Sequence, residues 1–324
     1  MKEVVYDGSL EGLFAVLDEA RRTGNAPGRI LRAPPGQPYS PEQPYPPARP
    51  DKSGLSGQAC GAVQGDLFDD AGTLPAGAAG PVPGFRPAPR AVPAGAGVEA
   101  CPAPSGEAAP VLFEVSVNAF DAFVRAWMSE FPIEAAIVRY ACKVLSAAEA
   151  AARTAGQTGA LFTEGSPSRA VSEAARRGAE KAAADRGDGD ALTVLEASYK
   201  VGYEIDKLRG LLRFTPDEHG VYTARCSPDH FVLPALGEHF CLRFGGTPWI
   251  IIDEKRGLSV FCFPGEAPRM RSVSSGSPRP ELSDGWEGLW RHYHKIINNE
   301  SRNNPALQRR FMPRRYWKYL PEMN

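Results

Sequence analysis

The sequence predicts an α+β fold: a single domain with an N-terminal strand and helix, a helical middle, two β-hairpins flanking a helix, and C-terminal helices. Three observations carry this prediction. Apolar residues recur at helical spacing near the start and again after residue 111. Two strand–turn–strand patterns follow them. The chain has 31 Pro and 33 Gly residues, and most of those above the usual frequency of these two residues lie between residues 34 and 110. This leaves roughly 200 to 220 residues for one core.

Residues 1–31 are predicted to form the strand and helix that open the domain. Val4, Val5 and Tyr6 are a short strand, and the stretch "YDGSLEGLFAVLDEARRTG" is a helix with Asp7 or Ser9 as its cap. Gly24 suits the end of that helix. One apolar face is formed by Leu10, Leu13, Phe14 and Leu17.

Residues 32–110 are predicted to be a disordered insertion. Stretches such as "APPGQPYSPEQPYPPARP" are rich in Pro, Gly and Ala and poor in large apolar residues. Such a segment buries too little apolar surface to offset the entropy lost on ordering. The main part of the domain is expected at residues 111–324.

The middle of the chain is predicted to be helical. The first helix has one face formed by Phe120, Phe123, Val124, Trp127 and Phe131. The Ala-rich, charged residues near 150–188 are either a surface helix or a flexible insertion, and we predict an insertion. A further amphipathic helix is predicted from Leu192, Leu195, Tyr199, Gly202 and Ile205.

Two hairpins are predicted in the C-terminal half, with turns at "TPDEHG" and "DEKRG". The helix between them is expected to start with Ser227 as cap and Pro228 at its first position. Residues 264–280 are predicted to be a second flexible insertion. The last long helix has an apolar stripe formed by Trp286, Leu289, Trp290, Tyr293 and Ile297.

Charge and cysteine usage exclude several classes of protein. The net charge of −1 gives no global attraction to DNA or membranes. No apolar stretch of about 18 residues exists and the start is not a signal peptide, so we expect a cytoplasmic protein without membrane contact. No C-x-x-C pair occurs, and Cys226, Cys241 and Cys262 are expected to be free cysteines in preference to a metal cluster. We predict no metal and no cofactor.

Catalytic candidates are few and weak. His230, in "SPDH", lies where a helix N-terminus could hold a phosphate, although a capping role is favoured. Asp253, Glu254 and Arg256 lie together in "WIIIDEKRG", where two carboxylates could act as acid and base. Adjacent charges in a turn are more often solvated. No phosphate-binding loop or nucleophile elbow is present, so the sequence leaves open whether the protein is an enzyme.

The closing stretch "RRFMPRRYWKYL" is the strongest charge asymmetry in the chain. Arginines bind phosphates and aromatic rings stack on bases, which favours a nucleic-acid interface. The alternative is that the aromatic residues seal the core while the arginines face water or pair with acids. The interface residues would be Arg302, Arg309, Arg310, Arg314, Arg315, Tyr316, Trp317 and Lys318.

Five motifs, in order, resemble those of a family of DNA metabolism proteins associated with a radical-SAM protein and catalogued as a domain of unknown function. They are "YDGSLEGLF", "LRGLLRF", "SPDHFVLPALGEHF", "WIIIDEKRG" and "ESRNNPALQRRFMPRRYWKYLPEM". Related domains are also fused to uracil-DNA-glycosylase-like domains. The resemblance implies a DNA-related role and a radical-SAM partner. It implies no catalytic residue here, and the chain lacks the CxxxCxxC motif of the radical enzyme.

The expected function is therefore a DNA-binding accessory protein in DNA repair or modification, working with a radical-SAM partner. In this hypothesis the basic residues of the closing stretch contact phosphates, and Tyr316 or Trp317 stacks on a base or supports the site. One alternative is an enzyme that processes nucleic acids or nucleotides at the hairpin ends. The other is a protein–protein adaptor without DNA contact.

Overall fold

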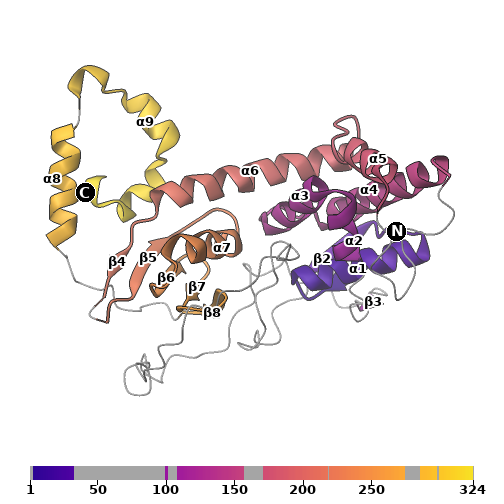
Figure 1. Cartoon of the computed structure of the whole chain (residues 1–324), viewed down its shortest axis with the longest axis horizontal. Coiled ribbons are helices and arrows are strands. Elements are labelled where there is room, and N and C mark those ends of the chain that lie inside the picture. Colours follow the sequence, from indigo (N-terminus) through magenta and orange to yellow (C-terminus); the bar gives the residue numbers. More distant parts are fainter. Residues whose placement is uncertain are drawn as a thin grey trace. The chain divides into compact units, whose positions relative to one another are not determined.

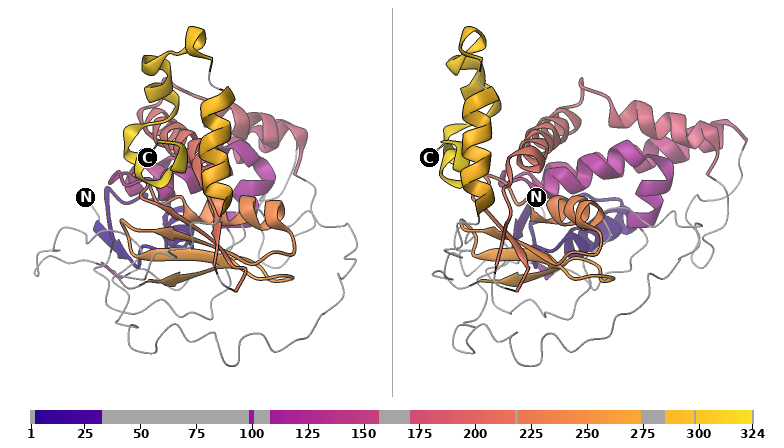
Figure 2. Two further views of the ribbon diagram at one scale, coloured as in Figure 1. Left: turned by 90° about the vertical axis from the view of Figure 1, so that its left-hand side faces the viewer. Right: turned by 60° about the vertical axis from the view of Figure 1, so that its left-hand side comes forward.

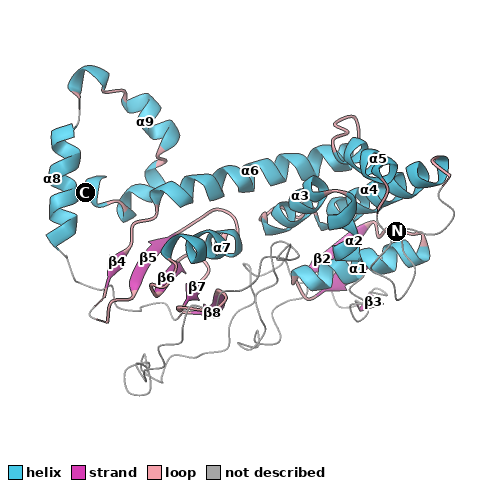
Figure 3. Ribbon diagram, in the orientation of Figure 1, coloured by secondary structure: helices cyan, strands magenta, loops and turns pink. Residues whose placement is uncertain are grey.

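The computed structural model describes residues 3–32, 99–100, 108–156, 171–217, 219–273, 285–297 and 299–323. The described residues form helices and two small sheets, which confirms the α+β class (Figures 1 and 3). The described residues form two compact units where the sequence predicted one. The first ends at Tyr203 and the second begins at Glu204. No described helix has both the length and the hydropathy of a membrane-spanning segment.

The first unit opens with the predicted strand and helix. Strand β1 (Glu3–Tyr6) lies between β2 (Arg29–Arg32) and β3 (Glu99–Ala100), and both pairings are parallel. Helix α1 (Leu10–Thr23) is capped by Ser9, whose hydroxyl accepts the Gly12 N–H at 2.9 Å. It ends at Gly24, where the backbone φ of 67° suits glycine.

Strand β3 lies inside the stretch predicted as a disordered insertion, so that prediction is wrong at residues 99–100. A two-residue strand pairs through its backbone groups and leaves no apolar alternation that a sequence pattern could reveal. Helix α2 (Ala108–Val115) also begins within the predicted insertion. Residues 33–98 and 101–107 lie outside the described ranges.

Helices α3 (Val117–Met128) and α4 (Glu134–Thr154) form the predicted helical middle. Phe120, Phe123 and Trp127 are buried, as their spacing predicts. Phe14 of α1 stacks on Phe123 with ring centroids 4.5 Å apart. The apolar faces of α1 and α3 therefore share one core.

Helix α5 (Glu173–Ala183) corrects the prediction of an insertion near 150–188. Ala175, Ala179 and Ala183 repeat every four residues and are buried. Gly178 sits so close to α4 that a Cβ there would lie 2.7 Å from the carbonyl oxygen of Ala147. Small side chains let these two helices approach closely, and a search for large apolar residues passes over such a face. Residues 157–170 lie outside the described part of the chain.

Gly178→Ala is expected to destabilise the protein by about 1–3 kcal/mol, because the new methyl group meets backbone that cannot move aside easily. The opposite change in stability is expected for Gly210→Ala, inside α6 (Gly189–Leu211), where a Cβ meets nothing within 4 Å. There alanine should stabilise by up to about 1 kcal/mol through helix propensity. Urea unfolding measures the change in the free energy of unfolding for both variants. Equal changes would show that the close approach of α5 to α4 at Gly178 does not disfavour a larger side chain there.

Helix α6 supplies residues to both units, and its buried face differs from the predicted one. Tyr199 is 73% exposed and Leu192 is also exposed. The buried face is formed by Ala191, Val194, Ala197, Ser198, Val201, Glu204, Ile205 and Leu208. Because this face contains small and polar residues, the larger side chains indicated the wrong side of the helix.

The second unit holds a five-stranded sheet in the order β4-β5-β6-β7-β8. Its strands are Thr215–Pro216, Tyr222–Cys226, Trp249–Asp253, Leu258–Cys262 and Arg269–Ser272. Both predicted hairpins are present, as β4–β5 and β6–β7, and they flank helix α7 (Leu233–Phe244) as expected. The first strand of the first hairpin was predicted in "LRGLLRF", which is wrong, because helix α6 continues to Leu211 and the strand begins at Thr215. A parallel pairing of β5 with β6 joins them into one sheet.

Two further predictions for this unit are wrong. Strand β8 lies inside the predicted insertion 264–280, where a single buried residue, Met270, is too weak a pattern to reveal a strand. Residues 274–280 lie outside the described ranges. Helix α7 starts at Leu233 and not at Pro228. It packs against one face of the sheet (Figure 2), and a Cβ on Gly237 would come within 2.8 Å of Val260.

Candidate nucleic-acid interface

Helix α8 (Gly285–Ile297) is followed by a series of short turns that contain the closing stretch. These are η1 (Glu300–Arg302), α9 (Pro305–Phe311), η2 (Arg314–Tyr319) and η3 (Pro321–Met323). Asn304 caps α9 by accepting the Leu307 N–H at 3.0 Å. Tyr316 and Leu320 are buried, whereas the side chains of α9 are largely exposed. The stretch therefore has a buried part and an exposed part.

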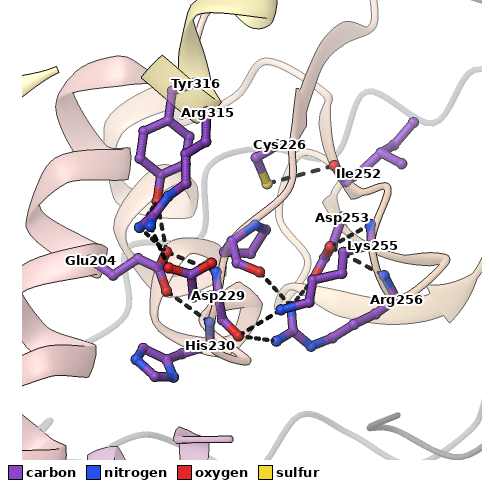
Figure 4. A network of polar contacts seen from close by, with 11 residues as sticks. Glu204, Cys226, Asp229, His230, Ile252, Asp253, Lys255, Arg256, Arg315 and Tyr316 are labelled. Atoms are coloured by element: carbon purple, nitrogen blue, oxygen red, sulfur yellow. Dashed lines mark hydrogen bonds and ion pairs between the residues drawn. The ribbon is translucent and has the colours of Figure 1, made fainter. Parts of the chain in front are cut away.

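Glu204 of α6 is the centre of the buried part (Figure 4). Glu204 is only 3% exposed to solvent. One carboxylate oxygen accepts the Asp229 N–H at 2.8 Å and the Tyr316 hydroxyl at 2.6 Å. The other accepts the His230 N–H at 2.8 Å. This carboxylate therefore joins the loop before α7 to the closing stretch.

Arg315 closes the same network from the surface. Its guanidinium donates to Glu204 at 2.9 Å and forms an ion pair with the carboxylate of Asp229. Burial and the charge of Glu204 raise the pKa of Tyr316 well above its usual range, so this phenol stays protonated as a donor. Tyr316 supports the site from the interior, since its ring is buried and its hydroxyl donates to Glu204.

Asp253 and Arg256 form a second buried pair at the end of β6. Their side chains are 0% and 2% exposed, and the Arg256 Nη1 lies 2.7 Å from the Asp253 Oδ2. Burial raises the pKa of Asp253, although the charge of Arg256 acts in the opposite direction. Arg256 also donates to the carbonyl oxygens of Pro228 at 3.2 Å and Asp229 at 2.8 Å. The turn after β6 therefore holds the same loop that Glu204 holds.

Glu254 anchors the closing stretch at another point. It accepts the Tyr319 hydroxyl at 2.7 Å and the Lys318 ammonium at 3.3 Å. Arg225 lies 3.6 Å from the same carboxylate. Burial alone would raise the pKa of Glu254, but the hydrogen bonds from Tyr319 and Lys318 outweigh it and lower the pKa.

The four catalytic candidates therefore lie around one loop, and their described contacts are internal. Asp253 pairs with Arg256, and Glu254 meets residues of the closing stretch. His230 donates its backbone N–H to Glu204, and its ring points away from the Asp253–Arg256 pair (Figure 4). At "SPDH" the predicted phosphate position is taken by the carboxylate of Glu204. The predicted helix cap is also wrong, because α7 begins later.

The eight residues predicted for the interface divide into three groups. Arg315, Tyr316 and Lys318 are tied to Glu204 or Glu254. Trp317 is half-buried, donates to the Met312 carbonyl at 2.8 Å and carries Arg314 over its ring at 5.6 Å. The other four cations, Arg302, Arg309, Arg310 and Arg314, are exposed, as Arg315 and Lys318 also are, and we name these four the arginine surface.

The three cysteines considered together in the sequence do not meet at one point. Cys226 is buried in β5, and its sulfur contacts the Ile252 carbonyl at 3.6 Å. Cys241 and Cys262 lie side by side, with 3.0 Å between their sulfur atoms. Within the described ranges, no group of three or more His, Cys, Asp or Glu is placed to hold a metal ion.

Glu204 is the residue that the sequence analysis missed. It was passed over as one polar residue in an amphipathic helix. A signal was present, because Val201, Ile205 and Leu208 lie at helical spacing around it and are all buried. A carboxylate on an apolar helix face needs donors, and this one receives them from two distant parts of the chain.

Comparison with known proteins gives one match. No curated protein and no solved structure matches the chain. The model of a family described as a domain of unknown function, DUF4130, matches residues 168–322. This range contains helix α5, helix α6, the five-stranded sheet and the closing stretch, including every residue of the Glu204 network. Residues 168–322, slightly less than half of the chain, are therefore similar to the DUF4130 family of domains of unknown function.

Proposed function

We propose that the protein is a DNA-binding accessory factor in DNA repair or modification, acting in the cytoplasm with a radical-SAM partner protein. The observation that supports DNA contact is the arginine surface. The repair or modification context and the protein partner rest on the five resembling motifs. Between residues 285 and 323 the chain carries eight Lys or Arg and three Glu, so this segment is locally basic in a chain of net charge −1.

Two features suit the arginine surface to phosphate binding. Guanidinium groups form paired hydrogen bonds with phosphate oxygens, and several of them along a segment give affinity with little sequence preference. The segment is also anchored, since Tyr316 and Tyr319 fix its other side to Glu204 and Glu254. Anchoring lowers the entropy lost when the arginines meet a ligand. Trp317, beside Arg314, is the candidate for base stacking.

DNA binding is expected to weaken steeply with salt, and the triple variant Arg309→Gln/Arg310→Gln/Arg314→Gln should flatten that dependence. Each arginine–phosphate interaction that the variant removes should reduce the magnitude of the slope of log K against log salt by about 0.9 for duplex DNA or about 0.7 for single strands. Fluorescence anisotropy with labelled single- and double-stranded oligonucleotides across a salt series measures both slopes. Arg315 is left intact because it belongs to the buried network.

The matched control is Arg176→Gln/Arg177→Gln/Arg186→Gln, which removes the same charge from exposed positions of the first unit. It should leave the slope unchanged. Equal losses in the two triple variants would mean that net charge alone attracts DNA. If the folded wild type binds neither form of DNA, the proposal fails and the protein–protein adaptor takes its place.

A further inference from the structure

The thiols of Cys241 and Cys262 form a pair inside the second unit. Cys241 lies near the end of α7 and Cys262 ends β7. Their sulfur atoms are 3.0 Å apart although the residues are 21 positions apart in sequence. A disulfide bond needs about 2.05 Å, so about 1 Å of movement would join them. Among the described residues of this unit the third cysteine is Cys226, whose sulfur contacts the Ile252 carbonyl instead.

The two thiols differ in their surroundings. Cys241 is half-buried and reachable from solvent, whereas Cys262 is buried. Burial and the neighbouring Cys241 raise the pKa of the Cys262 thiol to about 12. Both sulfur atoms also approach the carbonyl oxygen of Glu266, at 3.8 Å for Cys241 and 3.2 Å for Cys262. An accessible thiol backed by a buried one is the arrangement of an attacking cysteine and a resolving cysteine.

We propose that Cys241 and Cys262 are a site of reversible thiol–disulfide exchange with a small-molecule disulfide of the glutathione type. The thiolate of Cys241 attacks one sulfur of the small disulfide. A mixed disulfide forms at Cys241, and the first small thiol leaves with the proton. Cys262 then loses its proton and attacks the Cys241 sulfur, which releases the second small thiol. The protein loses two electrons and two protons, and the small disulfide gains them.

The product would be a covalent tie between α7 and β7. Helix α7 follows directly on the loop whose Asp229 and His230 N–H groups bind Glu204. The disulfide would therefore hold that helix, and the start of the network behind the closing stretch, against the sheet. Because such a bond restricts the unfolded chain, the oxidised protein should unfold at a higher temperature than the reduced one.

The test is incubation of the reduced full-length chain with oxidised glutathione, followed by alkylation and peptide mapping. Trypsin gives a peptide of residues 226–243, which holds Cys226 and Cys241, and one of residues 257–269, which holds Cys262. We expect these peptides to be linked, with a mass about 2 Da below the sum of their reduced forms. Fragmentation should place the link at Cys241, and dithiothreitol should reverse it.

Two variants keep the result decisive. Cys226→Ser should retain the link, and Cys241→Ser should lose it together with the rise in unfolding temperature. The pH dependence gives a further check, since the second step should accelerate as pH rises toward the pKa of Cys262. Glutathione retained on Cys241 as a stable mixed disulfide would overturn the proposal. A link through Cys226, or to a cysteine outside this unit, would overturn it as well.

Discussion

Glu204→Ala is expected to lower the free energy of unfolding by about 3–5 kcal/mol, the cost of removing one partner from a buried charged network. The change leaves the N–H groups of Asp229 and His230 and the hydroxyl of Tyr316 without their acceptor. The carboxylate that they lose is buried, since Glu204 is 3% exposed, and Tyr316 is buried as well. Urea unfolding followed by tryptophan fluorescence measures the loss.

Asp206→Ala is the control, since it removes a carboxylate from the same helix whose described contact is an exposed ion pair with Arg209. Exposed pairs of this kind contribute about 0–1 kcal/mol. The loss in the free energy of unfolding for Glu204→Gln should fall between those of Glu204→Ala and Asp206→Ala. The amide keeps one oxygen acceptor but turns an NH₂ group toward the N–H and O–H donors. If Glu204→Ala costs no more than Asp206→Ala, the network does not hold the closing stretch in place.

The same variant separates the two interpretations of "RRFMPRRYWKYL". Tyr316 joins this stretch to Glu204 and is buried, so one side of the stretch seals the second unit. Arg309 and Arg310 are exposed on the other side of the stretch. The sequence analysis treated the two interpretations as alternatives. In the structure one side of the stretch is buried and the other is exposed, so a sealing role for the first side is compatible with the proposed DNA contact of the second. We therefore expect Glu204→Ala to weaken DNA binding indirectly, by releasing the segment that carries the arginine surface.

Elements with large apolar residues at regular spacing were predictable from sequence. The opening helix has a capping serine, a terminal glycine and four apolar residues on one face, and each signal is local. The second hairpin was predictable for the same reason, since β6 is a run of buried residues followed by a charged turn. Local signals also placed the catalytic candidates in one neighbourhood, but they could not show which charges were already paired.

What escaped prediction depends on contacts between distant residues. Helix α5 is held by alanines that pack only because Gly178 lets α4 approach. Strands β3 and β8 are defined by backbone pairing with neighbours. The role of Glu204 requires donors 25 and 112 positions away. No periodicity within one segment contains that information, because the relevant partner lies elsewhere in the chain.

Arg256→Met is expected to cost about 3–5 kcal/mol at pH 7, because it leaves the buried carboxylate of Asp253 without its counter-charge. Asp253→Leu/Arg256→Met should cost less than the sum of the two single changes, since the double variant contains no isolated charge. The hydrogen bonds from Arg256 to Pro228 and Asp229 are absent in both cases, so the double variant should still be less stable than the wild type.

The pH dependence of this deficit identifies its cause. Burial already raises the pKa of Asp253 in the folded state, and removing Arg256 takes away the charge that opposes this rise. A carboxyl group whose folded pKa exceeds its unfolded pKa destabilises the protein at pH values above both, and this penalty disappears as the group is protonated on acidification. The deficit of Arg256→Met relative to wild type should therefore be constant well above the variant's raised folded pKa and shrink as the pH falls through that pKa. Urea unfolding at several pH values measures it, and a deficit independent of pH would assign the loss to packing and hydrogen bonds alone.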